Sequence, residues 1–105
     1  MTSDDEIYEY LGQTFEWNRM KAMRNTLVHA VRFPEAATVF WDRDAISQFD
    51  EEHSEDEERY TIVGRSIHSH TLFVVHIVKS TRIRIISARQ ATPKERRDYE
   101  ARLGR

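Results

Sequence analysis

The chain has 105 residues, of which 32% are charged and 39% hydrophobic, and its formal net charge is −2. The length fits one domain, the composition is that of an ordinary globular protein, and no apolar run is long enough to cross a membrane. Cysteine is absent, which excludes disulfides, thiolate metal sites and cysteine nucleophiles. The acidic start differs from the basic region of a secretory signal, so we expect a cytoplasmic protein without a membrane partner.

The net charge hides an asymmetry between two parts of the chain. Residues 1–63 carry 6 Lys/Arg and 15 Asp/Glu, a net charge of −9, whereas residues 64–105 carry 10 and 3, a net charge of +7. The basic part suggests a nucleic-acid or other charged partner. Alternatively, the two parts only neutralise each other across the folded surface.

The first fourteen residues contain a helix-start signal. Ser3 and Glu6 have the spacing of a capping box, and Gly12 is a typical helix stop. These signals predict a short helix over residues 4–11.

A strand and a longer helix are predicted next. Apolar alternation predicts a strand at 15–17, and Asn18 can cap a helix over 19–28. The apolar positions of this helix recur at helical spacing, which predicts a buried stripe. That stripe consists of Met20, Met23 and Leu27.

A second helix and an acidic loop complete the first part. Pro34 suits the first turn of a helix that continues to about Trp41. A strand is expected at 45–49. Seven acids among residues 50–58 then indicate a solvated loop.

The chain after the acidic loop predicts three strands and a helix. The strands are expected at 59–65, 71–78 and 81–89, and a capping box at Thr92–Glu95 starts a helix over 93–103. The order of elements predicts an α+β fold, in which an antiparallel sheet carries the helices on one face.

The strand at 81–89 carries three arginines. Arg82 and Arg84 share one face, and strict alternation places Arg89 on the other unless the strand bulges at Ile85-Ile86. Arginines on a strand favour an anion-binding surface. The alternative is that they pair with acids of the acidic loop, namely Glu52, Glu55 and Glu58.

Many short motifs together resemble the BrnT family, relatives of the RelE-type ribonuclease toxins. The matching pieces are Phe15-Glu16-Trp17, Lys21 and Asn25; His29, Val31 and Phe33; Glu35-Ala36-Ala37-Thr38-Val39-Phe40; Glu52-His53-Ser54-Glu55; Glu58-Arg59; Gly64-Arg65-Ser66; and Arg82-Ile83-Arg84-Ile85-Ile86-Ser87-Ala88-Arg89 with Ala91-Thr92, Glu95-Arg96 and Tyr99-Glu100. The resemblance covers about residues 15–101, and the 82–100 piece is its most specific part. Four positions differ from the family pattern. Asn18-Arg19 stands where Asp-Pro is usual, Val28 stands where a lysine is usual, and Ala30 stands where a glycine is usual.

The resemblance implies a fold and a function. The fold is RelE-like α+β, with an antiparallel sheet, two helices in the N-terminal half and a C-terminal helix. The single domain 1–105 then comprises a toxin domain, 15–101, and an N-terminal extension, 1–14. The implied activity is a metal-independent ribonuclease that cleaves RNA and inhibits translation. The implied partner is a ribbon-helix-helix antitoxin of the BrnA type, whose hetero-oligomeric complex binds promoter DNA.

RNA cleavage through the neighbouring 2′-hydroxyl needs a base, an acid and cations around the phosphorane. The candidate catalytic residues are Lys21, His29, Arg59, Arg82 and Arg84, and the candidate phosphate-binding residues are Arg65, Arg89 and Lys94. Each has a plainer alternative role, as solvated surface, as an ion-pair partner or, for His29, as a hydrogen-bond donor at a helix end.

No cofactor or metal is expected. His68 and His70 have a spacing that could bind zinc, but no third ligand is evident. A different function is also open, because Val28 replaces the family's lysine. The chain would then be a catalytically weak relative that acts as a binding module in an antitoxin-containing repressor complex.

Overall fold

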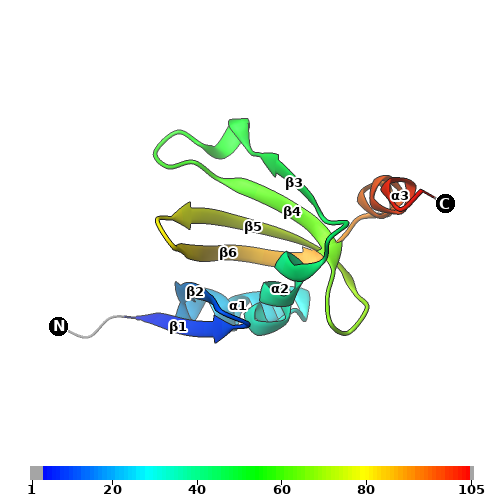
Figure 1. Cartoon of the computed structure of the whole chain (residues 1–105). Helices are drawn as coiled ribbons and strands as arrows, with labels where there is room; N and C mark the ends of the chain where they lie inside the picture. Colours follow the sequence, from blue (N-terminus) through cyan, green and yellow to red (C-terminus); the bar gives the residue numbers. More distant parts are fainter. Residues whose placement is uncertain (1–3, 105) are drawn as a thin grey trace.

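The computed structural model describes residues 4–104, which form a six-stranded sheet and three α-helices (Figure 1). The strands are β1 (Asp5–Tyr10), β2 (Gln13–Asn18), β3 (Ile46–Phe49), β4 (Tyr60–Arg65), β5 (Thr71–Lys79) and β6 (Arg82–Gln90). The helices are α1 (Arg19–His29), α2 (Phe33–Thr38) and α3 (Pro93–Arg102), with short 3₁₀ turns η1 (Val39–Trp41) and η2 (Glu51–His53). The predicted α+β class is confirmed, as are the three strands after the acidic loop and both later helix starts.

The sheet is mainly antiparallel, with the strand order β1-β2-β6-β5-β4-β3. One pair departs from the predicted antiparallel sheet, because β2 runs parallel to β6, with Thr14 opposite Arg82 and Glu16 opposite Arg84. Parallel neighbours require a long crossover connection, which α1, α2 and the β3–β5 meander provide here. The β1–β2 hairpin therefore extends the sheet beyond β6, which is the last strand along the chain.

The predicted helix over 4–11 is wrong, since residues 5–10 form the edge strand β1. Leu11 and Gly12 have φ angles of 48° and 87°, which suit a two-residue hairpin turn. Tyr8 and Tyr10 alternate onto the side of the core. Pairing with β2 outweighs the local capping signal, because so short a helix is marginal alone. Ser3 of the predicted capping box lies outside the described residues.

The helices do not share one face of the sheet. The main core packs Phe15, Trp17 and Leu72 against Phe33 and the other buried residues of α2 and η1. A smaller cluster on the opposite face joins Val63 to Tyr99 of α3. Successive strand residues point to opposite faces, so Ile62 faces the first cluster and Val63 the second. The expectation of helices on one face is therefore corrected.

Helix α1 forms where it was predicted, but the face that it turns toward the sheet is not the predicted one. Its boundaries and its cap are confirmed, because the Asn18 side chain accepts a hydrogen bond from Lys21 N at 3.0 Å. The expected buried stripe is wrong, since Met20, Met23 and Leu27 are exposed by 63, 57 and 82%.

The residue that fastens α1 to the sheet is Asn25, the buried residue of this helix. Its amide donates to Ala88 O at 2.8 Å and to Val31 O at 2.9 Å, and it accepts from Ala88 N at 3.1 Å. Asn25 therefore satisfies the free backbone edge of β6, beyond the point where β2 ends its pairing. These hydrogen bonds of Asn25 hold the helix against the sheet, and the apolar residues Met20, Met23 and Leu27 face solvent.

Candidate nucleic-acid interface

The strand β6 contains the bulge that the sequence allowed. Val75 is opposite Ser87, but His76 is opposite Ile85, so Ile86 is the extra residue. The bulge turns Ile85 and Ala88 both into the core. It also returns Arg89 to the face that carries Arg82 and Arg84.

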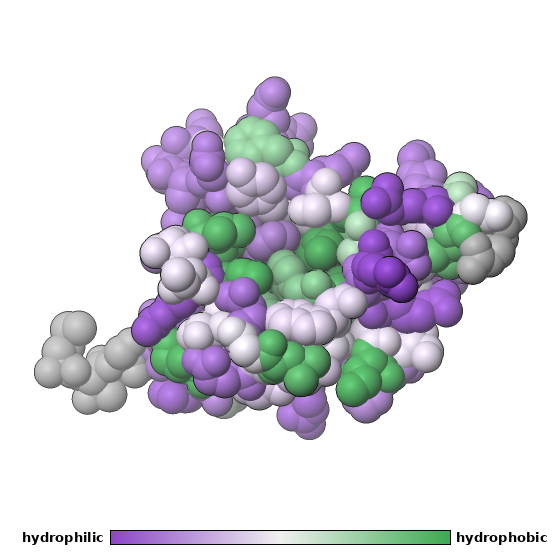
Figure 2. Space-filling model, viewed as in Figure 1, coloured by the Kyte–Doolittle hydropathy of each residue, from purple (hydrophilic) through white to green (hydrophobic). Residues whose placement is uncertain are grey.

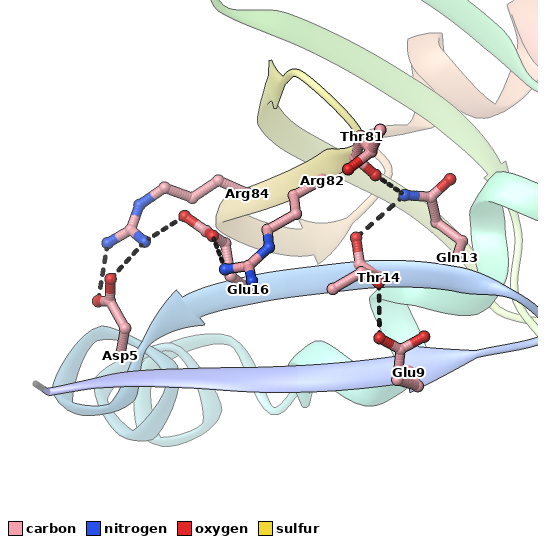
Figure 3. A network of polar contacts seen from close by, with 8 residues as sticks. All are labelled: Asp5, Glu9, Gln13, Thr14, Glu16, Thr81, Arg82 and Arg84. Atoms are coloured by element: carbon pink, nitrogen blue, oxygen red, sulfur yellow. Dashed lines mark hydrogen bonds and ion pairs between the residues drawn. The ribbon is translucent and has the colours of Figure 1, made fainter.

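Arg82 and Arg84 are paired with acids of the first two strands (Figure 3). The Arg84 guanidinium binds both carboxylate oxygens of Asp5, at 3.0 and 3.1 Å, and one oxygen of Glu16 at 2.9 Å. Arg82 reaches the other Glu16 oxygen at 3.3 Å. The partners expected in the acidic loop are therefore wrong for these two arginines.

The pairing shifts the pKa values of Asp5, Glu16 and Arg84 in the directions that favour their charged forms. The Arg84 hydrogen bonds hold the pKa of Asp5 below its usual value, and the same pairing raises the pKa of Arg84. Burial would raise the pKa of Glu16, but hydrogen bonds from Arg84 and Arg82 outweigh it and lower that pKa. A phosphate approaching Arg84 must therefore compete with two carboxylates, whereas the half-exposed Arg82 has one.

Three candidate phosphate-binding residues lie at the other end of the sheet, around α3. Arg89 forms a two-point ion pair with Glu95 at 2.9 and 3.0 Å and lies 4.0 Å from the centroid of the Phe73 ring. Lys94 pairs with Asp98 at 2.9 Å. Arg65 lies 5.9 Å from the centroid of the Tyr99 ring.

These three residues hold α3 in place or neutralise its surface, and they do not meet Arg82 and Arg84. Arg59 precedes β4 and lies 3.8 Å from Glu57, an ion pair within the acidic segment. The predicted residues are therefore divided among several places on the molecule.

A pocket between α1 and β6 brings two of the predicted catalytic residues together. Its volume is about 310 Å³, and its lining includes Lys21, Arg24, Val28, His29 and Ser87. Lys21, Arg24 and His29 are exposed. None of the three forms an ion pair with any residue from 4 to 104. Arg24 was missed as a site residue, although its place three residues after Lys21 puts the two side chains on one side of the helix.

The histidines after β4 belong to a hydrogen-bonded cluster. His70 Nδ1 lies 2.7 Å from Glu35 Oε2, and the Ser66 hydroxyl donates to the same oxygen at 2.6 Å. Burial would raise the pKa of Glu35, but the bonds from Ser66 and His70 outweigh it and lower that pKa. Across residues 4–104, no group of three His, Cys, Asp or Glu is arranged to hold a metal ion. Nor is any helix in this range long and apolar enough to span a membrane.

The fold and the site together define a small α+β protein whose accessible, unpaired cations lie beside an arginine-bearing strand. A family model described as "Ribonuclease toxin, BrnT, of type II toxin-antitoxin system" matches residues 17–95, about three quarters of the chain. The chain therefore belongs to the BrnT family of ribonuclease toxins, and a type II toxin implies an antitoxin partner. Among curated proteins, none matches the chain.

The match begins near the end of β2 and ends in the first turn of α3. Lys21, Arg24, His29, Arg82 and Arg84 lie inside it. The two acids that pair with the arginines, Asp5 and Glu16, lie before it.

Proposed function

We propose that this chain is a metal-independent endoribonuclease with a RelE-like fold, which acts in the cytoplasm, cleaves RNA and inhibits translation. A ribbon-helix-helix antitoxin of the BrnA type neutralises it in a hetero-oligomer, and the chain reaches promoter DNA only through that antitoxin. The observation that carries the proposal is the cluster of unpaired cations in the α1–β6 pocket of a chain from a ribonuclease toxin family.

The pocket contains side chains suited to the reaction. His29 is the group that transfers a proton, because an imidazole ring can act as a general acid or a general base. Lys21, together with Arg24, stabilises the charge that develops on the phosphorane, and each such donor contributes about 3–4 kcal/mol in comparable sites.

The arginines outside the pocket have graded roles in this proposal. Arg82 meets a phosphate directly because it is half-exposed, and Arg84 positions Glu16 and Arg82. Arg59 contacts RNA just before β4, since its own ion pair with Glu57 is long, at 3.8 Å, and the Arg59 side chain is partly exposed. The residues around α3 bind phosphates farther along the RNA; these are Arg65, Arg89 and Lys94.

The test is inducible expression in a bacterial host, with growth and total RNA integrity as readouts. We expect the wild type to arrest growth and fragment RNA, and Lys21→Ala/His29→Ala to reduce cleavage by about a hundredfold or more. The matched control is Arg96→Ala/Arg97→Ala, which removes two exposed charges of α3 and leaves cleavage intact.

Neither pocket residue is buried, so both double variants should unfold at the wild-type urea concentration. Arg82→Ala is included as a third variant in place of Arg84→Ala. The loss of Arg84 would leave the largely buried Glu16 carboxylate without its shorter ion pair. A folded, abundant wild type that leaves RNA intact would refute the proposed activity.

One observation favours the second candidate function, a catalytically weak relative that acts mainly by binding. Val28 lines the pocket and is 66% exposed at the position where the resemblance places a lysine. We expect Val28→Lys to raise RNA cleavage about tenfold or more by adding a third full cation. Val28→Met, which keeps the position uncharged, is the control. An inactive wild type that Val28→Lys activates would support the weak-relative function.

A further inference from the structure

Helix α1 is capped and hydrogen-bonded to the sheet, yet it presents apolar residues to solvent. Met20, Met23 and Leu27 are spaced for one helical face and remain largely exposed. Asn18 caps the start of the helix, and Asn25 fixes its middle to β6. Exposed apolar stripes on ordered helices mark interaction sites. In Figure 2, large apolar side chains lie among polar ones on the molecular surface.

Hollows lie on both sides of the ridge that Met23 and Leu27 form. One hollow, of about 460 Å³, runs between this ridge and Phe33, with Tyr8 and Trp17 among its lining residues. The other, of about 390 Å³, lies toward Lys21. A ridge between two grooves is the surface into which a second helix packs.

The rim of this surface is strongly basic. Arg19, Lys21, Arg24 and Arg32 line one or other hollow, and all four are exposed. None of them forms an ion pair within residues 4–104. One acid, Glu6, lines the first hollow, and its carboxylate already accepts a hydrogen bond from Trp17 Nε1 at 3.0 Å.

We propose that the Met20–Met23–Leu27 stripe binds an amphipathic helix of a partner protein, with apolar side chains in the two hollows and acidic side chains against the rim. Methionine side chains adapt readily to a partner's shape. A second copy of the chain is disfavoured, because a two-fold contact would bring the four rim cations of each copy together. An RNA backbone would satisfy the cations but leave the three apolar side chains uncovered.

This proposal describes how the proposed ribonuclease would be regulated, and it rests on that proposed function. Lys21 and Arg24 belong both to the rim and to the α1–β6 pocket. A helix seated on the stripe therefore places carboxylates on the cations that RNA would need. Binding of the partner and binding of RNA become mutually exclusive through shared residues.

The test is selection from a displayed library of 18-residue helical peptides (about five turns). Their apolar stripe is constant, and their flanking positions vary between Glu and Lys. The target is the full-length purified chain. We expect enriched peptides to carry Glu flanks and a synthetic one to bind in fluorescence anisotropy without RNA. Met23→Glu/Leu27→Glu should weaken binding by about tenfold or more. Lys21→Glu/Arg24→Glu should weaken it and favour the matching Lys-flanked peptide.

Several outcomes would overturn the inference: no enriched peptide, Lys-flanked peptides on the wild type, or binding insensitive to both double variants. Concentration-dependent dimerisation that Met23→Glu/Leu27→Glu abolishes would assign the stripe to a second copy. RNA cleavage by the same proteins without peptide is measured separately. Met23→Ser/Leu27→Ser, which adds no charge beside Lys21 and Arg24, should cleave RNA like the wild type while escaping the peptide, so failure of docking and failure of the ribonuclease proposal are distinguishable.

Discussion

Ala30 ends α1 in a left-handed conformation, with a φ of 58°, and its N–H donates to Thr26 O at 2.9 Å. An L side chain adopts this conformation at a cost that glycine avoids. We expect Ala30→Gly to raise the free energy of unfolding by about 0.5–1 kcal/mol. Urea denaturation should show a higher midpoint with an unchanged slope. Ala22→Gly, inside the same helix, is the control and should lower the midpoint.

His76 is buried between two aromatic rings, with 4% of its surface exposed. Its ring centroid lies 4.8 Å from that of Phe40 and 6.1 Å from that of Tyr60. Its Nδ1 has no hydrogen-bond partner among the described residues. Burial lowers the pKa of His76 to about 4.

The lowered pKa makes stability depend on pH. The unfolded chain binds a proton at His76 near pH 6.5, whereas the folded chain resists protonation until about pH 4. The stabilisation is therefore complete above pH 6.5 and is lost as the pH falls toward 4. We expect a loss of about 2–3 kcal/mol over this window in urea titrations at several pH values.

The control for this pH dependence is His76→Leu, which should remove most of the slope between pH 6.5 and 4.5. Carboxylates with lowered pKa values, such as Glu16 and Glu35, contribute below that window. A wild-type stability that stays flat from pH 7 to 4.5 would contradict the prediction.

At the scale of elements, β4 approaches η1 and the turn after it at Gly64. A Cβ atom at this position would lie 2.9 Å from Ala45 Cβ and 2.9 Å from Val39 Cγ1. Both neighbours are packed against the core, so they cannot move aside cheaply. We expect Gly64→Ala to lower the free energy of unfolding by about 1–3 kcal/mol, seen as a lower Tm.

The matched control is Gln48→Ala on the neighbouring strand β3. This side chain is exposed, so its removal should change the free energy of unfolding by no more than about 0.5 kcal/mol. Equal Tm values for the two variants would show that β4 and η1 separate easily.

Helix α3 shows how one side chain can serve two elements. The Thr92 hydroxyl accepts from Glu95 N, and the Glu95 carboxylate accepts from Thr92 N, as in the predicted capping box. The same carboxylate accepts hydrogen bonds from Arg89 of β6, and these bonds lower the pKa of Glu95.

Tyr99, also in α3, donates a hydrogen bond to Asp42 Oδ2 at 2.5 Å. Burial, reinforced by Asp42, raises the pKa of Tyr99 to about 12.

At the scale of the whole molecule, the acidic and basic parts of the chain partly neutralise each other. Asp5 and Glu16 from the first 63 residues pair with Arg84 and Arg82 from the second part. The accessible unpaired cations of α1 come instead from the acidic part of the chain. Net charge along the sequence is therefore a poor guide to where a phosphate binds.

This distribution predicts the salt dependence of RNA binding. Each phosphate contact contributes about −0.7 to the slope of log K against log salt for a single strand. We expect Lys21→Ala to reduce the slope by about that amount. Lys94→Ala should reduce it less because Asp98 already neutralises Lys94. Anisotropy with a 2′-O-methyl RNA, which cannot be cleaved, measures both slopes, and equal changes would contradict the assignment.

Several parts of the fold and site follow from residues close together in the chain. Asn18 predicts the start of α1, and Ile85-Ile86 is compatible with the bulge that β6 contains. The family follows from short motifs, which the match over residues 17–95 confirms. These features depend on capping, periodicity and motif spacing, which act over a few residues.

Other features depend on residues that only the folded chain brings together. Arg82 meets Glu16 from 66 positions away, and Arg84 meets Asp5 from 79 positions away. Residues 5–10 form a strand because β2 offers hydrogen bonds that outweigh a local helix signal.

The sequence by itself determined the α+β class, the family, the main elements and the positions of the cations. The tertiary structure decided which arginines lie beside acids, which cations of α1 remain unpaired and which face of that helix meets solvent. The physical reason is that helix caps and strand patterns arise between near neighbours, whereas ion pairs and burial depend on the packing of distant segments.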